Sequence, residues 1–474
     1  MKGLDRIVLS IALSIALFGC KTFKEPLEEA NRNTPERYFE SSDTTNVADI
    51  DWREFFGDEN LASLIDTALS NNQELNILLQ EIIVSSNEVR ARKGEYLPFV
   101  GVGVGVGLEK EGLYTRKGAV DDQLQIRPGQ EFPEPLGDFK LGAYASWELD
   151  IWKKLRNSKK AAVARYLGTI EGKNFLVTNL VAEIAESYFE LLALDNSLAN
   201  IQNYMAIQKK ALQAAKQQKD AAKITQLAVN RFEAQWLNTQ NLQYAVSQQI
   251  VETENHINFL IGRFPQAIER NALQFDSLHF EDVSAGLPAQ LLANRPDIRK
   301  AEFELEATKL DVKVARANFF PSFGLKAGIG FQAFNPKFIF SPESLLYNLA
   351  GDLMAPLINR KAIKAAYFTA KAQQVQAVID YEQTILQAFI DVVNQLSKID
   401  NYAQSYNTKA REVQLLTQST NIANNLFNSA RADYNEVLLT QEEALDSKME
   451  LIEIKKEQLS AKVNIYRALG GGWK

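Results

Sequence analysis

The same transition occurs twice in this chain: a helical stretch meets a proline and then changes to a strand. After Pro98 the chain alternates valine with glycine, and after Pro321 it again alternates apolar with small or polar residues. The offset between the two prolines also pairs Gly105 with Gly328. Proline lacks the amide hydrogen and disfavours helix at the preceding residue, so both helices should end there. A long proline-free tract follows each copy. Short strands that interrupt long helices in two repeats predict a duplicated architecture, and a membrane-spanning tube is one of the few that requires it.

The amino-acid composition limits which classes of function are possible. The chain has 474 residues, of which 46% are hydrophobic and 23% charged, as is typical of folded proteins. Its net charge of −7 argues against nucleic acid as a partner. Two histidines and one cysteine leave little for a metal site or a thiol nucleophile, and no phosphate-binding loop or Ser-His-Asp arrangement is present. We therefore expect no cofactor, no metal and no enzymatic activity, although the abundant carboxylates leave ordinary side-chain catalysis open.

The N-terminus has the pattern of an export signal. Lys2 and Arg6 precede an apolar run over residues 7–18, and Gly19 and Cys20 follow. This run is shorter than the roughly 20 residues that span a bilayer as a helix, but it suits a secretory signal over residues 1–19. A cysteine directly after a small residue resembles a bacterial lipobox, which predicts that Cys20 becomes the acylated first residue. The alternative is an ordinary signal peptide with an incidental cysteine.

Four segments alternate an apolar face with a small or polar face. In the first, the apolar side contains only valines and a leucine, and the other side contains only glycines after Phe99. Strands of about ten residues with these faces suit a transmembrane barrel with a wet lumen, whereas a soluble sandwich is the alternative. The export signal and the aromatic residues near the strand ends, such as Tyr96 and Trp147, favour the barrel. The predicted strands are 96–108, 139–150, 319–334 and 344–356, with a long exposed loop at 109–138.

Four strands are too few for a barrel that holds water. Small closed barrels need about eight strands, and a channel needs more. The four strands therefore either pack on another element or combine with the strands of further copies. Cyclic assembly of identical subunits leaves no open sheet edge, so it accounts for the strand number.

The two proline-free tracts predict long helical hairpins. No glycine occurs over residues 352–469, and helices of this length far exceed the usual three turns. Folded once, each tract would give two arms of about 50–60 residues. We place the turns at 219–223 and 429–433. Before the first tract, Asp58 is expected to cap a helix that breaks at Asn71 and Asn72.

The chain therefore divides into five predicted parts. These are a signal peptide (1–19), a lipidated extended arm (20–57), a first repeat (58–262), a linker (263–284) and a second repeat (285–474).

Three motifs resemble those of the TolC-type outer-membrane efflux proteins, in particular the lipoprotein branch. They are the runs from Asn294 to Glu302, from Ala315 to Ser322 and from Ala468 to Trp473. The resemblance covers nearly the whole mature chain, in the family's order of helices and strands. It implies a homotrimer in which each copy gives four strands to a 12-stranded outer-membrane barrel and its helices to a periplasmic α-barrel. It also implies a passive exit duct that is coupled to a periplasmic adaptor and an energised inner-membrane pump.

The first motif has a local physical interpretation. Asn294 is expected to cap a helix that begins near Pro296, and Asp297 complements the positive helix end. Arg295 and Arg299 are expected to pair with carboxylates such as Glu302 or those of a neighbouring segment. We interpret the motif as scaffold; a docking surface is the alternative.

The hairpin turns are the expected gate. In this family the helical tips close the duct, and acidic residues of the second hairpin face the lumen. We align Gln226 with Glu436, whose three copies would approach one axis and attract cations. Arg431 is expected to pair with an acid of a neighbouring hairpin. The alternative is that these residues are solvated charges at the turns, each of which contributes under about 1 kcal/mol to stability. The predicted gate residues are Glu436, Asp433, Gln226, Thr225 and Arg431.

Two other function classes remain open at the level of sequence. One is a lipid-anchored periplasmic structural or adaptor protein, in which the strands form a soluble domain. The other is an enzyme at the outer membrane, against which stands the lack of a convergent catalytic set. Within the duct class the cargo stays undetermined, because the pump chooses it: drugs, metals, peptides and lipids all fit.

Overall fold

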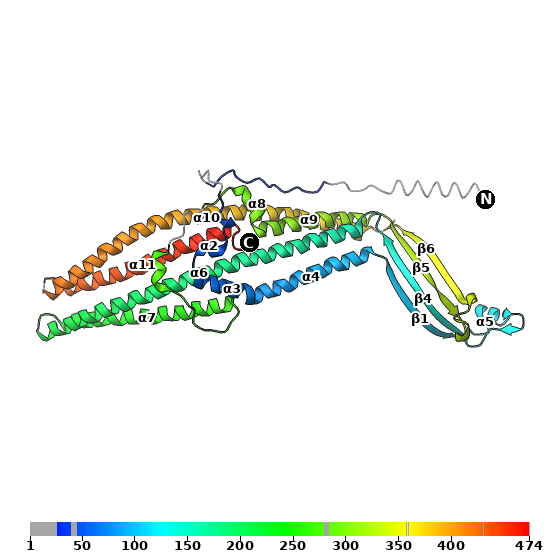
Figure 1. Cartoon of the computed structure of the whole chain (residues 1–474), viewed down its shortest axis with the longest axis horizontal. Coiled ribbons are helices and arrows are strands. Elements are labelled where there is room, and N and C mark those ends of the chain that lie inside the picture. Colours follow the sequence, from blue (N-terminus) through cyan, green and yellow to red (C-terminus); the bar gives the residue numbers. More distant parts are fainter. Residues whose placement is uncertain are drawn as a thin grey trace. The chain divides into compact units, whose positions relative to one another are not determined.

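The computed structural model describes residues 26–38, 45–278, 284–356, 358, 360–429 and 431–473. The predicted signal peptide and Cys20 lie outside the described residues. The chain forms two compact units. The first contains the N-terminal segment to Glu29 with residues 84–166 and 303–379, and the second contains residues 30–83, 167–302 and 380–474. Both are drawn in Figure 1.

A four-stranded antiparallel sheet dominates the first unit (Figure 1). Helix α4 ends at Tyr96 and the first strand begins at Phe99, while helix α9 ends at Ala317 and the third long strand begins at Ser322. The helix-to-strand change at Pro98 and Pro321 thus lies where the prolines predict it. The strands, in the sheet order β1-β4-β5-β6, are β1 (Phe99–Glu109), β4 (Leu136–Leu149), β5 (Ser322–Ala333) and β6 (Leu345–Met354).

The expected long loop after β1 carries elements of its own. These are α5 (Arg116–Asp121), β2 (Gln125–Arg127) and β3 (Gln130–Glu131). The Thr115 hydroxyl accepts a hydrogen bond from the Gly118 amide at 3.1 Å and so caps α5. Lys117 lies 2.8 Å from Glu109 and 2.7 Å from Glu111, which ties α5 to the end of β1.

Helices make up the rest of the described chain. Asp58 caps α3 and Asn72 separates α3 from α4, as the sequence predicts. The α-helices are α2 (Trp52–Phe56), α3 (Glu59–Asn71), α4 (Gln73–Tyr96), α6 (Lys154–Asp220), α7 (Gln226–Leu260), α8 (Leu291–Asn294), α9 (Pro296–Ala317), α10 (Lys361–Asn428) and α11 (Tyr434–Ala468). The 3-10 turns are η1 (Val47–Asp49), η2 (Ala272–Ser277), η3 (Pro288–Gln290), η4 (Pro336–Phe338) and η5 (Pro342–Ser344).

The two hairpins turn where predicted, but their arms are unequal. Helices α6 and α10 have 67 and 68 residues, whereas α7 and α11 have 35 each. The prediction of two arms of about 50–60 residues is therefore wrong. It assumed that each tract folds in half. Instead the first arm follows closely on a strand, and the second arm ends early, beside Gly262 or Gly470, where the backbone turns left-handed.

The hairpins share one apolar core beside their turns. The Phe232 ring on α7 lies 5.6 Å from the Phe427 ring on α10, centroid to centroid. Gln218 donates a hydrogen bond to the Phe427 carbonyl at 3.3 Å. The two hairpins therefore hold each other at the tip. The buried cluster comprises Ala211, Leu212, Ala215, Val229, Phe232, Ala423, Phe427 and Val437.

The N-terminal arm is extended and anchored by specific contacts. The fully buried Gln374 side chain on α10 donates to the Glu28 carbonyl at 2.8 Å and accepts from the Glu28 amide at 3.2 Å. In the second unit, the Tyr38 ring stacks on Phe389 at 5.4 Å. The arm thus substitutes side-chain partners for the missing backbone partners of a strand.

Candidate functional site: the faces of the sheet and the helical tips

One face of the four-stranded sheet is continuously apolar. The register aligns Val102 with Ala143, Ala143 with Ile329, and Ile329 with Tyr347. The five apolar side chains of β1 on this face are between 66% and 75% exposed. Monomeric soluble proteins rarely expose so continuous an apolar surface. Such a face suits contact with lipid.

The opposite face is polar or small. Lys140 lies 2.7 Å from Asp138, and Lys326 lies 3.3 Å from Asp352. The Gln332 amide donates to Asp138 at 2.8 Å. Neighbouring charges of this face therefore neutralise each other, which suits a water-filled lumen. The remaining positions of this face are mostly glycines on β1 and β5.

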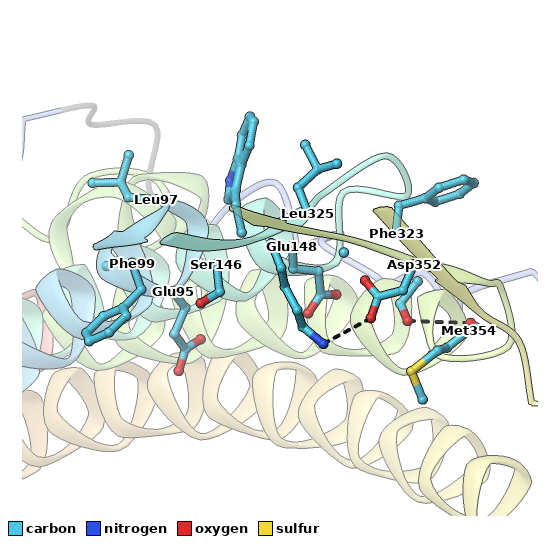
Figure 2. Close-up of a pocket in the computed structure, with 14 residues that line it drawn as sticks. Glu95, Leu97, Phe99, Ser146, Glu148, Phe323, Leu325, Asp352 and Met354 are labelled. Carbon is cyan, nitrogen blue, oxygen red and sulfur yellow. Dashed lines mark hydrogen bonds and ion pairs between the residues drawn. The ribbon is translucent and has the colours of Figure 1, made fainter. Parts of the chain in front are cut away.

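A cavity of about 470 Å³ lies where the sheet meets α4. Figure 2 shows that Leu97 and Leu325 point to one side of the sheet, whereas Phe99, Ser146 and Met354 point to the other. Apolar Phe99 and Met354 thus share the face that is polar or small at most other positions. They are 60% and 67% exposed.

The second helix of each hairpin begins with a capping residue. The Thr225 hydroxyl accepts from the Ala228 amide at 3.4 Å at the start of α7. The Asp433 carboxylate accepts from the Asn435 amide at 3.5 Å at the start of α11. Thr225 and Asp433 are therefore equivalent residues of the two repeats, and each has a local structural role.

This equivalence corrects the alignment of the two tips. With the caps superposed, the counterpart of Glu436 is Ala228, not Gln226, and the buried Val229 corresponds to the buried Val437. The alignment from sequence is wrong by two residues. A comparison of four residues covers little more than one helical turn, which is too short for the period of the apolar positions to fix the alignment.

Within the part of the chain that the structure describes, the other predicted gate residues lie at the turns without a charged partner. Glu436 is exposed in the first turn of α11, and Gln226 donates to Asn230 at 2.7 Å. Among the described residues of this single chain, no ion pair involves Arg431. At the first hairpin turn, Lys219 lies 4.0 Å from Asp220. The chain thus places Glu436 and Arg431 in solvent beside the shared apolar core.

Arg295 is the centre of a buried cluster in the second unit. It is 7% exposed, donates to Asp297 at 2.6 Å and to the Ala468 carbonyl at 2.9 Å, and lies 3.4 Å from Asp391. Burial alone would lower the pKa of Arg295, but the bonds to the two aspartates outweigh it and the pKa is raised. Arg295 therefore ties α9, α10 and the end of α11 together, as expected of a scaffold motif.

One detail of the motif differs from expectation. Asn294 is the last residue of α8 and does not cap α9, because Arg295 is the extended residue directly before Pro296. Arg299 pairs with Glu171 at 2.7 Å, a carboxylate of a neighbouring segment as expected. Glu302 instead pairs with Arg32 of the N-terminal arm at 2.7 Å.

No sequence pattern indicates the side chains that hold the segment after α7 in place. Arg270 lies 2.5 Å from both Asp195 and Glu254. Lys455, which is 2% exposed, donates to the Leu278 carbonyl at 2.7 Å. These partners are distant in sequence and follow no recurring spacing, so only the folded chain brings them together.

Over the described ranges, no helix is both long enough and apolar enough to span a bilayer. The same residues contain no group of three or more His, Cys, Asp and Glu side chains arranged to hold a metal ion.

A family model described as "Outer membrane efflux protein" matches residues 64–263 and 287–471. The chain is 26% identical over 479 residues to the cation efflux system protein CusC of Escherichia coli O6:H1, with 98% of each chain covered. It is 25% identical over 467 residues to the pyoverdine export outer membrane protein OpmQ of Pseudomonas aeruginosa, with 98% of this chain and 96% of the relative covered.

A solved structure of CusC superposes with a TM-score of 0.82 at 23% identity, covering 96% of this chain and 100% of that chain. At this identity the similarity shows that the two chains share a fold.

Proposed function

Because this chain belongs to the outer membrane efflux protein family and is an outer-membrane efflux channel, we propose that it works as a homotrimer. Three copies would contribute four strands each to a 12-stranded barrel, and their hairpins would form a periplasmic tube. The main support for this proposal is the exposed apolar face of the sheet. Its other face is polar and paired, and four strands alone leave two open edges.

The proposed role is the exit duct of a tripartite system. Transport energy would come from an inner-membrane pump through a periplasmic adaptor, since family members are channels. CusC is named for cations and OpmQ for pyoverdine. Relatives of similar identity thus differ in cargo, which supports the view that the pump chooses it.

We also propose cleavage after residue 19, acylation of Cys20, and the division into an arm (20–57), two repeats (58–262 and 285–474) and a linker (263–284).

The architecture predicts a defined channel. Purified protein in planar bilayers should give single-channel steps of one unit size, and its mass in detergent should equal three chains plus bound detergent. Heating in SDS should shift its gel migration, because folded barrels resist SDS. Monomer mass without conductance, together with release from membranes by cleavage of the lipid anchor alone, would support the lipid-anchored periplasmic protein instead.

Glu436 is proposed to set the ion preference of the closed tip. Three carboxylates around one axis attract cations in a narrow, water-poor constriction. Glu436→Gln trimers should therefore lose most of their cation preference, seen as a reversal potential closer to zero across a salt gradient. Asp220→Asn is the matched control, because Asp220 is a 78% exposed acid of the other turn. Equal reversal potentials for wild type and Glu436→Gln would remove Glu436 from the gate.

A further inference from the structure

The open edges of the sheet are the outer edges of β1 and β6. They have nearly equal lengths, 11 and 10 residues. In a closed ring of copies, β6 of one copy must pair with β1 of the next. We infer that this seam adopts the register that sets Met354 of one copy opposite Phe99 of the next. The inference rests on the proposed trimer and deepens it, because each seam site is incomplete without a second copy.

Two conditions select this register. All ten residues of β6 must find partners within β1, and the apolar faces must remain continuous, since a slip of one residue moves every side chain to the other face. Only one antiparallel register meets both. It sets Leu353 opposite Val100 and Leu345 opposite Leu108 on the lipid side. On the lumen side it sets Met354 opposite Phe99.

The strand tilt that this register produces supports the same choice. The row of partners that starts at Phe99 crosses Ser146, Lys326 and Ala350. In the inferred register it meets the next copy at Gly103, four residues further along β1. Over three copies this stagger tilts the strands by about 35°, within the range of outer-membrane barrels.

The neighbouring registers fit less well. With Met354 opposite Gly101 the tilt rises to about 46° and Leu345 lies beyond the end of β1. With Met354 opposite Leu97, which precedes β1, the tilt falls to about 19°.

The side-chain sizes on the lumen face support the same neighbours. Within the chain, side chains of β4 and β6 lie over glycines of β1 and β5. A Cβ at Gly101 would lie 2.6 Å from the Tyr144 ring, and one at Gly328 would lie 2.8 Å from the Asn348 amide oxygen. Glycine-rich and large-residue strands thus alternate across the sheet. The seam continues the alternation, because β6 has large residues and β1 has glycines.

The consequence is an apolar collar inside the barrel near the ends of the strands. Phe99 and Met354 share the lumen face but lie on the two edge strands of one sheet. Three interstrand spacings place these strands about 14 Å apart. The seam brings them together between copies, where a thioether and an aromatic ring attract each other. With Tyr144 beside Gly101, three such pairs would line a mostly polar lumen and offer a surface to the apolar part of a cargo molecule.

Cross-linking of the full-length trimer tests the register. The double variant Phe99→Cys with Met354→Cys should give covalent dimers and trimers on non-reducing SDS gels, and reductant should remove them. A link within one chain is excluded, because a disulfide requires Cα atoms within about 7 Å. The pair Val100→Cys with Leu353→Cys should cross-link too. Neighbouring pairs alternate between close and wide spacing, so one of the two has the close geometry.

The outcomes separate the register from the assembly. Stronger cross-linking of Gly101→Cys with Met354→Cys than of either inferred pair would overturn the register while keeping the trimer. Absence of any cross-link in protein that has trimer mass would overturn both the inferred register and the one with Met354 opposite Gly101. Monomer mass in wild type would overturn the proposed assembly itself.

Discussion

Val104→Arg should abolish assembly of the channel in the outer membrane. Val104 lies in the middle of β1 and is 75% exposed on the apolar face. An arginine at the midplane of a barrel's lipid face costs about 2–4 kcal/mol. Three copies multiply this to about 6–12 kcal/mol, which rivals the whole stability of many folded proteins. We expect loss of the SDS-resistant trimer from the outer-membrane fraction.

Gly103→Arg is the matched control for this substitution. It introduces the same side chain at the adjacent position of the same strand, but on the lumen face, where a Cβ meets nothing closer than 4.0 Å. The guanidinium would stand in water beside other paired charges, so the trimer should form with a changed conductance. Normal assembly of Val104→Arg would show that the apolar face does not meet lipid, and a soluble packing partner would then have to cover it.

The elements that the sequence predicted are those with strong local signals. Proline at 98 and 321 fixes the change from helix to strand, and alternation fixes which side chains share a face. The hairpin turns lie near their predicted positions, although halving each tract gives the wrong arm lengths. The family motifs add the order of these elements, and the match over both repeats confirms it.

The features that were mispredicted depend on packing. The arm lengths depend on where the second arm ends beside Gly262 and Gly470. The tip alignment depends on which residues cap α7 and α11. The ring of partners around Arg295 joins α9 to residues far along the chain. Helical periodicity predicts which face of a helix is buried. It does not predict which distant segment of the chain packs against that face.

The Arg295 cluster predicts the largest loss of stability outside the sheet. Arg295→Ala would leave Asp297 and Asp391 without their cation and the Ala468 carbonyl without its donor. Removing one partner of a buried ion pair costs about 3–5 kcal/mol. We expect the low end, about 3 kcal/mol, because Asp391 is partly exposed and Asp297 still accepts from the Ile298 amide. Arg295→Lys keeps the charge but not the forked geometry of the guanidinium, so its loss of stability should lie between zero and that of Arg295→Ala.

Urea unfolding of detergent-solubilised trimers, followed by helical circular dichroism, measures this loss as a lower midpoint. Arg411→Ala is the control, because Arg411 is exposed on α10 and bonds only to Gln414 among the described residues, so its cost should stay within about 0.5 kcal/mol. SDS resistance of the barrel reports whether the sheet stays assembled while the helices loosen. An unchanged midpoint for Arg295→Ala would contradict the scaffold interpretation. The cluster around Arg295 would then have to serve docking, and loss of adaptor binding by a fully stable Arg295→Ala trimer would be its signature.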